Sequence, residues 1–266
     1  MPIKRDETGK RWVEMQLLLP GTPEQLWQAL ATAAGYCGWF TKTEIDGRVG
    51  GKVQFDFGDG TTSSGEVTDW QPPQRFAYVE HDWEKDAPPI ATEITITARS
   101  GDRCVVRMVH SLFTTADSWD DQVEGFESGW QGLFEVLRVY LAHFLGQEAA
   151  AFWVMTSSQA EPLATWQKLC AELGIAGASV GERRRMSAGA ESWSCVVEHV
   201  HQDAKQRYYV LRLEGPRPGI ALLGTYATGE TTRVSISRYF YGDDVEARAA
   251  QAEPVWRDWL RANFGS

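Results

Sequence analysis

Apolar and polar residues alternate along much of the first half of the chain, with the period of half-exposed β-strands. Val53, Phe55 and Phe57 alternate with polar residues after Gly50-Gly51, and a period of two places successive side chains on opposite faces of a sheet. The same pattern predicts strands over residues 11–19, 65–70, 75–81, 90–98 and 103–111. Segments rich in Pro, Gly and Asp separate the later strands and are typical of tight turns. The first half is therefore expected to form an antiparallel meander.

A short helix and a long helix are expected on either side of this meander. Thr22 suits a helix N-cap and Pro23 suits the first helical position. The short helix should therefore begin near residue 23 and end at Gly35. Residues 121–145 keep aromatic and aliphatic side chains on one helical face. We expect this long helix to pack on the apolar face of the sheet.

The long helix also contains a stripe of glycines, Gly125, Gly129 and Gly132. A glycine inside a helix costs about 0.5 to 1 kcal/mol relative to alanine, so the stripe suggests a compensating role. One interpretation is close contact with the sheet. The other is a helix wall that is thinned to leave room for a ligand.

The second half of the chain repeats the plan of the first. The segment PEQLWQAL at residues 23–30 returns as PLATWQKL at residues 162–169, with Pro, Trp, Gln and Leu at the same positions. Strand-like runs and a final helix follow at residues 180–186, 193–201, 207–214, 220–227, 231–241 and 243–263. These patterns predict one domain over residues 1–146, a linker over 147–151 and a second domain over 152–266.

Composition and charge narrow the class of protein. The hydrophobic content is 43%, and no apolar run approaches the roughly 20 residues that span a bilayer. The first residues lack the core of a signal peptide, so we expect a cytoplasmic protein. Residues 1–146 carry 13 basic and 22 acidic groups, and residues 147–266 carry 13 and 14. A net charge of −10 disfavours nucleic acid as a partner. The four cysteines form no CxxC pair and are expected as free thiols.

The order of short motifs in residues 11–146 resembles the START-like (SRPBCC) superfamily. Within it, the segment is similar to the branch named for homologues of the activator of the heat-shock-protein-90 ATPase. The motifs are Leu26-Trp27-Gln28-Ala29-Leu30, Trp39-Phe40, Gly50-Gly51-Lys52-Val53-Gln54-Phe55, Gly65-Glu66-Val67, Pro72-Pro73-Gln74-Arg75-Phe76 and Gly129-Trp130.

The resemblance implies an α+β helix-grip fold. In this fold a curved antiparallel sheet wraps around a long C-terminal helix and leaves an apolar cavity between them. Residues 152–264 share only helix positions and strand count with the first half and lack its Gly-Gly and Pro-Pro motifs. The second half is therefore either a diverged copy or a different small α+β domain.

Strand alternation and the aromatic content select a set of candidate ligand-binding residues. They are Trp39, Phe55, Phe57, Trp70, Phe76, Tyr78, Met108, His110, Trp130 and Phe134. Aromatic side chains at such spacing also build ordinary cores, so both interpretations stay open. Residues 103–111 are partly apolar on both faces, so periodicity does not decide which face points inward. If His110 points inward, it can hydrogen-bond the polar end of an apolar ligand or serve a structural role.

The sequence offers no catalytic, metal or cofactor motif. It lacks a Gly-x-Ser-x-Gly elbow, a phosphate loop, a dinucleotide fingerprint and an HExxH helix. His199 and His201 share one face of a strand, but two imidazoles alone do not define a metal site. We therefore expect no catalytic residue, no metal ligand and no cofactor.

Three functions remain as alternatives. The leading hypothesis is a carrier or sensor that binds an apolar small molecule in the cavity between sheet and helix. A co-chaperone-like module with a protein partner is the second, as the family name suggests. The third is an enzyme of cyclase or hydrolase type that uses scattered cavity residues, as some START-like relatives do.

Overall fold

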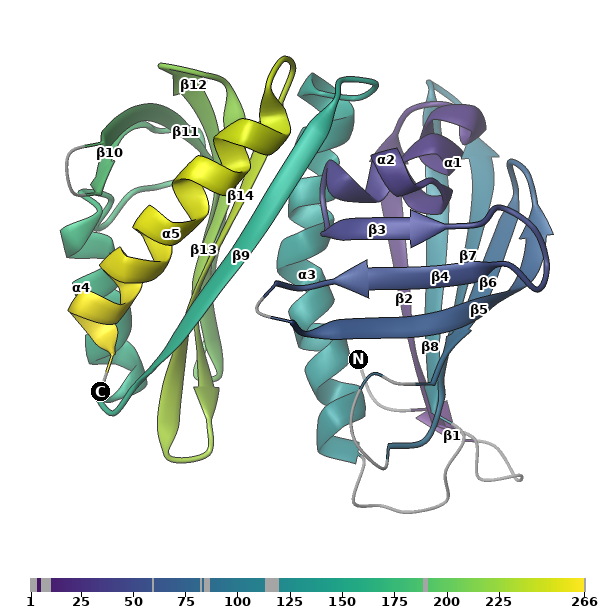
Figure 1. Ribbon diagram of the computed structural model, residues 1–266, viewed down its shortest axis with the longest axis horizontal. Helices are drawn as coiled ribbons and strands as arrows, with labels where there is room; N and C mark the ends of the chain where they lie inside the picture. Colours follow the sequence, from purple (N-terminus) through teal and green to yellow (C-terminus); the bar gives the residue numbers. More distant parts are fainter. Residues whose placement is uncertain are drawn as a thin grey trace. The chain divides into compact units, whose positions relative to one another are not determined.

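The structure is a computed structural model that describes residues 4–5, 11–58, 60–81, 83, 87–112, 120–188 and 191–265. The chain divides into two compact units, Met1–Gly146 and Gln147–Ser266, and each unit has its own antiparallel sheet (Figure 1). Within the described residues, no helix is long and apolar enough to cross a membrane.

The first unit is an α+β domain with an eight-stranded sheet in the order β1-β2-β8-β7-β6-β5-β4-β3. The first long strand therefore pairs with the last strand, and the others follow as a meander. The strands are β1 (Lys4–Arg5), β2 (Arg11–Pro20), β3 (Lys42–Ile45), β4 (Lys52–Asp56), β5 (Thr62–Gln71), β6 (Arg75–Glu80), β7 (Ile90–Arg99) and β8 (Arg103–Leu112). The helices are α1 (Pro23–Ala31), α2 (Ala33–Cys37) and α3 (Asp120–His143).

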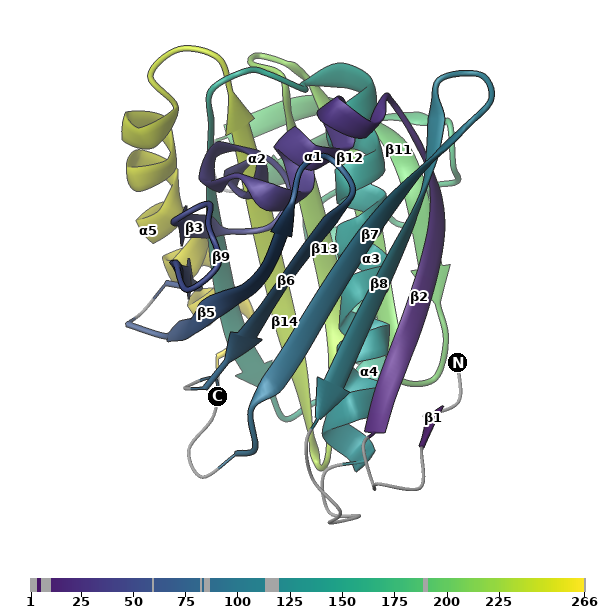
Figure 2. The ribbon, with the colours of Figure 1, turned by 90° about the vertical axis from the view of Figure 1, so that its right-hand side faces the viewer.

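The sheet bends around the long helix. In Figure 1, strands β3, β4 and β5 run horizontally, whereas β2, β7 and β8 run vertically, in the same direction as the axis of α3. Figure 2 shows the same sheet from the face turned away from α3, so α3 lies behind β7 and β8. A curved antiparallel sheet that wraps a long C-terminal helix is the helix-grip fold, so the fold class predicted from the sequence is confirmed.

Strand β8 shows how alternation assigns side chains to the two faces of this sheet. Cys104, Val106, Met108 and His110 are buried on the inner face, where the His110 ring stacks on Trp130 of α3. Periodicity alone left this orientation open because both faces carry apolar residues. The contact with α3 settles it, since only the inner face meets the helix.

Helix α1 begins as predicted but ends earlier. Thr22 accepts a hydrogen bond from the Gln25 backbone and Gln25 bonds back to Thr22, which completes a capping box. The predicted end at Gly35 is wrong, because Thr32 is extended (φ −120°, ψ 150°) and caps the next helix, α2. Gly35 lies inside α2, where a Cβ atom would stand 1.9 Å from the Gln28 carbonyl oxygen. The glycine therefore allows α2 to pack closely on α1.

The glycine stripe of α3 is only partly explained by packing. Gly129 is exposed, and a Cβ atom there would meet no described atom within 4 Å. Gly132 is buried. The surroundings of Gly125 lie outside the described side chains. Close contact with the sheet therefore does not account for Gly129.

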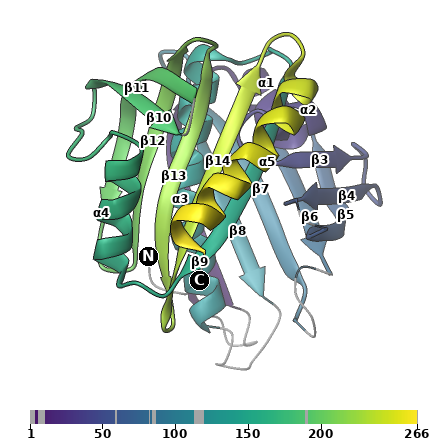
Figure 3. The same cartoon turned by 60° about the vertical axis from the view of Figure 1, so that its left-hand side comes forward.

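The second unit has a six-stranded antiparallel sheet in the order β10-β11-β12-β13-β14-β9. Its elements are β9 (Ala149–Ser158), α4 (Pro162–Glu172), β10 (Arg183–Ala188), β11 (Glu191–Gln202), β12 (Gln206–Gly215), β13 (Gly219–Thr228), β14 (Thr231–Tyr241) and α5 (Val245–Phe264). Figure 3 shows α4 and α5 on the same face of this sheet. As in the first unit from β2 onward, the first strand pairs with the last strand, a helix follows the first strand, and a long helix closes the unit. The two units thus share this plan, although the first sheet contains β1 and one further strand and the first unit has an additional short helix, α2.

Strand β9 includes three residues that the sequence pattern places in a linker. Residues 149–151 pair in register with residues 239–241 of β14. A run of alanines carries no alternation of apolar and polar residues, so periodicity could not place them in a strand.

Candidate functional site

The inner face of the first sheet, with α2 and α3 against it, carries the residues that the sequence singled out. Phe55, Trp70, Phe76, Tyr78, Met108 and His110 lie on strands, and Trp130 and Phe134 lie on α3. Trp39 follows the C-cap of α2, and Phe57 directly follows β4. Centroids of neighbouring rings are separated by 5.4 Å for Trp70–Phe76, 5.2 Å for Phe76–Tyr78 and 5.6 Å for Phe55–Tyr78. Met108 is fully buried on the same face.

The helices continue this aromatic surface. Trp130 stacks on Phe134 with ring centroids 5.5 Å apart, and Phe134 lies 6.3 Å from Trp39. Two aromatic residues that were absent from the predicted set complete it. Phe40 stacks on Trp130 at 4.9 Å, and Tyr36 lies 5.5 Å from Phe55. The adjacent pair Trp39-Phe40 marked this region in the sequence, whereas nothing distinguished Tyr36.

A row of polar side chains crosses this aromatic face. Tyr78, Thr92 and His110 are direct neighbours in register on β6, β7 and β8. The Tyr78 hydroxyl bonds to the Thr92 side chain, and Thr92 Oγ1 lies 2.9 Å from His110 Nδ1. All three residues are at most 5% exposed. Thr92 was missed because its role depends on the register between strands, which periodicity does not give.

His110 is held as a neutral imidazole at the end of this row. Its ring stacks on Trp130 with centroids 5.3 Å apart and an interplanar angle of 19°. Burial lowers the pKa of His110 from 6.5 to about 4, since the charged form cannot be solvated there. At neutral pH the ring therefore has one N–H donor and one nitrogen acceptor.

Glu80 continues the inner face of β6 beyond Tyr78 and is partly buried. Its carboxyl group accepts a hydrogen bond from the Ser63 hydroxyl. Burial raises the pKa of Glu80 from 4.5 to about 7 despite that bond. Burial also raises the pKa of both Tyr36 and Tyr78, and the charge of Glu80 raises each further. The alternation Phe76, Tyr78, Glu80 was the signal that could have identified this carboxyl group.

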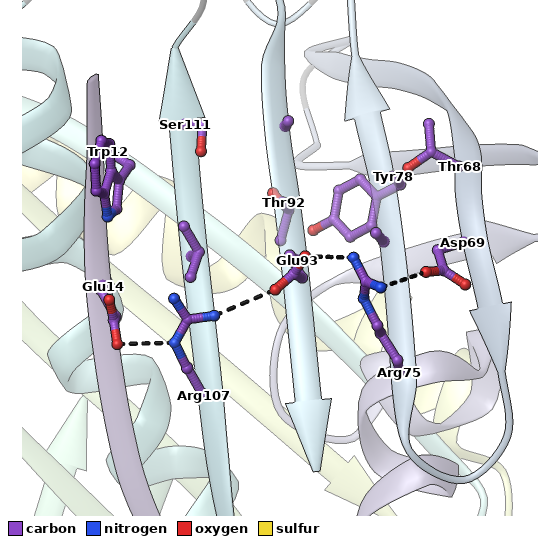
Figure 4. Close-up of a pocket in the computed structure, with 13 residues that line it drawn as sticks. Trp12, Glu14, Thr68, Asp69, Arg75, Tyr78, Thr92, Glu93, Arg107 and Ser111 are labelled. Carbon is purple, nitrogen blue, oxygen red and sulfur yellow. Dashed lines mark hydrogen bonds and ion pairs between the residues drawn. The ribbon is translucent and has the colours of Figure 1, made fainter. Parts of the chain in front are cut away.

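The opposite face of the sheet carries an open groove of about 490 Å³ with a different character. A row of ion pairs joins the neighbouring strands β2, β8, β7, β6 and β5 (Figure 4). It runs from Glu14 to Arg107 (2.8 Å), Glu93 (3.2 Å), Arg75 (2.7 Å) and Asp69 (3.1 Å). Hydrogen bonds from Arg107 and Lys4 lower the pKa of Glu14 to about 2. Each charge in this row has an opposite partner, so the row ties strands together and leaves little capacity for a ligand.

The inner face is the better candidate site. It combines a broad aromatic surface with a neutral imidazole, two phenols and a carboxyl group that is half-protonated near pH 7. Such groups donate and accept hydrogen bonds to the polar end of a bound molecule. Within the described part of the chain, no cluster of three His, Cys, Asp or Glu residues could hold a metal ion.

Fold and site together define the first unit as a START-like domain, in which a sheet grips a C-terminal helix over an aromatic inner face. Residues 20–142 match the family described as "Activator of Hsp90 ATPase homolog 1-like protein". No curated protein matches the chain.

Several solved structures are similar to this chain. CalU16 from Micromonospora echinospora is 18% identical with a TM-score of 0.43, covering 53% of this chain and 83% of its own. MLL2253 from Mesorhizobium loti is 23% identical with a TM-score of 0.46, covering 50% and 97%. DynU16, a protein of the dynemicin biosynthetic locus, is 16% identical with a TM-score of 0.43, covering 95% and 97%.

Proposed function

We propose that the first unit binds an apolar small molecule with a polar end between its sheet and α3, as a carrier or sensor. The aromatic side chains of the inner face contact the apolar body. The polar end is bound by the row that contains Tyr78, Thr92 and His110, with Glu80 close to it.

The observation that carries this proposal is the polar row inside an aromatic surface. Burying imidazole and carboxyl groups costs the solvation of their charged forms, and buried hydroxyl groups must be hydrogen-bonded to avoid a further cost. A core that served packing alone would use aliphatic side chains at these positions. The shifted pKa values of His110 and Glu80 show that this cost is present. Binding of a ligand's polar end would explain why polar groups occupy these positions despite that cost.

An equilibrium titration of the full chain with Nile red tests the proposal. Nile red is apolar and uncharged, has hydrogen-bond acceptors at one end, and fluoresces in apolar surroundings. The wild-type chain is expected to bind it, and His110→Phe is expected to bind it about three- to tenfold more weakly, because one hydrogen bond contributes about 0.5–1.5 kcal/mol. Phenylalanine keeps the stacking on Trp130, so the change isolates the ring nitrogens.

The matched control is His143→Phe, the same substitution on the exposed last turn of α3. It should leave Nile red binding unchanged. Thermal unfolding of each variant checks that the fold is intact. Failure of the wild-type chain to bind Nile red would refute the binding site, and equal affinities of the two variants would refute the role of His110.

The raised pKa of Glu80 favours a second candidate, an enzyme that uses acid–base chemistry on the bound molecule. A carboxyl group with a pKa of about 7 can give and take a proton at neutral pH. Glu80→Gln keeps the shape and the bond from Ser63 but removes that proton transfer. An enzyme would lose turnover in this variant and still bind ligand, whereas a carrier would bind ligand and show no turnover in either form.

A further inference from the structure

A buried arginine with two unpartnered nitrogen atoms lies in the described part of the second unit. Arg238 is on the inner face of β14 and is 4% exposed. Its Nε and Nη1 atoms have no hydrogen-bond partner among the described residues. The guanidinium carbon lies 4.7 Å from the ring of Trp193, 5.3 Å from Phe240 and 5.5 Å from Trp256. Aromatic rings therefore surround a charge that forms no ion pair with any residue that the structure describes.

The aromatic rings do not compensate for the burial of this charge. Removing a guanidinium group from water costs more than cation–π contacts return, and each N–H without an acceptor adds to that cost. Burial lowers the pKa of Arg238 to about 10, so it stays charged at neutral pH. Glu191 lies near enough to favour the charged form but makes no ion pair with it. A bound anion would supply both the opposite charge and the missing acceptors.

Arg238 lines a cavity of about 580 Å³ that is large enough to hold an organic anion. The cavity is formed by the start of β11, the turn between β12 and β13, the end of β14 and the first turns of α5. Its charged residues are Arg217, Arg238, Arg248 and Glu191, so cations outnumber anions three to one. Its apolar wall includes Trp193, Pro216, Pro218, Phe240, Ala252 and Val255. This size and mixed lining are typical of small-molecule sites.

Arg248 is fixed beside the same apolar wall. Its Nη1 atom donates to the backbone oxygens of Tyr241 at 3.1 Å and Asp243 at 3.3 Å. Its guanidinium group lies 5.4 Å from the Phe240 ring, which Arg238 also contacts. An anion bound between the guanidinium groups of Arg238 and Arg248 would offset the repulsion between their charges. Arginine suits this task because its planar N–H groups match the oxygens of a carboxylate or phosphate.

We propose that the second unit binds an organic anion in this cavity, with its carboxylate or phosphate head on Arg238 and Arg248 and its apolar body on Trp193, Phe240 and Val255. This site lies outside the residues that match the family, and it is independent of the function proposed for the first unit. Val255 is 52% exposed and forms the rim, so the body of the ligand enters there.

Calorimetric titration of the full chain with decanoate and with decyl phosphate tests this site, with uncharged decanamide as the matched ligand. The wild-type chain should bind at least one of the anions and bind decanamide more weakly. Arg238→Met keeps the length and apolar character of the side chain and should weaken anion binding roughly tenfold to a hundredfold, as expected for a charged hydrogen bond. Arg248→Met, at a partly exposed position, should weaken it roughly threefold or more.

The matched control is Arg233→Met, which lies on the same strand but is exposed on its other face. It should bind the anions like wild type, which separates the specific site from general loss of positive charge. No binding of either anion to the wild-type chain would overturn the proposal. Equal anion affinity in wild type and in both Arg238→Met and Arg248→Met would also overturn it. If Arg238→Met fails to fold, the comparison of Arg248→Met with Arg233→Met decides.

Discussion

Glu80 should make the protein less stable as pH rises, whereas carboxyl groups with a lowered pKa make a protein more stable as pH rises. Replacing Glu80 with glutamine should remove this pH dependence. The pKa of Glu80 rises from 4.5 in the unfolded chain to about 7 in the folded chain. Between these values the folded state holds a proton that the unfolded state has lost. The free energy of unfolding therefore falls as pH rises through this window and is constant above it.

The magnitude follows from the two pKa values. A shift from 4.5 to about 7 corresponds to about 3 kcal/mol of stability that is present below pH 4.5 and lost by pH 8. Glutamine is always neutral and its carbonyl oxygen can still accept the bond from Ser63. Glu80→Gln should therefore stabilise the protein by about 3 kcal/mol more at pH 8 than at pH 4.5, relative to wild type.

Urea unfolding of wild type and Glu80→Gln at pH 4.5 and pH 8 measures this difference. The second unit is identical in both proteins, so it does not contribute to the difference between them. Glu66→Gln, at an exposed position on the neighbouring strand β5, is the control and should change stability by less than about 0.5 kcal/mol at both pH values. The same stability difference for Glu80→Gln at pH 4.5 and pH 8 would refute the conclusion that burial keeps Glu80 protonated.

Three further predictions concern the first unit. The pKa of His110 falls from 6.5 to about 4 on folding, so the free energy of unfolding is lost as pH falls through this range. Urea unfolding at pH 7 and pH 4 should show that His110→Phe loses about 3 kcal/mol less of this free energy than wild type does. Equal losses in the two proteins would contradict the prediction. Gly35→Ala should lower the melting temperature clearly, because the new Cβ atom would stand 1.9 Å from the Gln28 carbonyl oxygen; a change of less than a degree would show that α2 can shift freely. Thr22→Ala removes the cap of α1 and should cost about 1 kcal/mol in urea unfolding, whereas Thr22→Ser should restore it.

Much of the fold follows from local patterns in the sequence. Prolines and glycines end the strands, and alternation shows where each strand runs. The pair Thr22-Pro23 places the start of α1. Strand β3 (Lys42–Ile45) was missed because it is a short edge strand with few apolar residues. Gly35 misled because a glycine ends a helix in one context and allows close helix packing in another.

The candidate sites depend on information that alternation does not contain. The row from Tyr78 to His110 exists because three strands pair in a particular register, and register is set by the whole sheet. Arg238 was visible in principle, because it shares the inward period of Val234 and Ile236. Its candidate role in anion binding follows only from the three aromatic rings around it, which come from β11, β14 and α5.

The native mass of the full chain tests the central claim most directly. The chain is measured after purification under native conditions, and again after incubation with an excess of Nile red, and both values are compared with the denatured mass. The proposed binding site in the first unit predicts one retained apolar molecule per chain, either a co-purified compound or Nile red. Native masses equal to the denatured mass in both samples would contradict it.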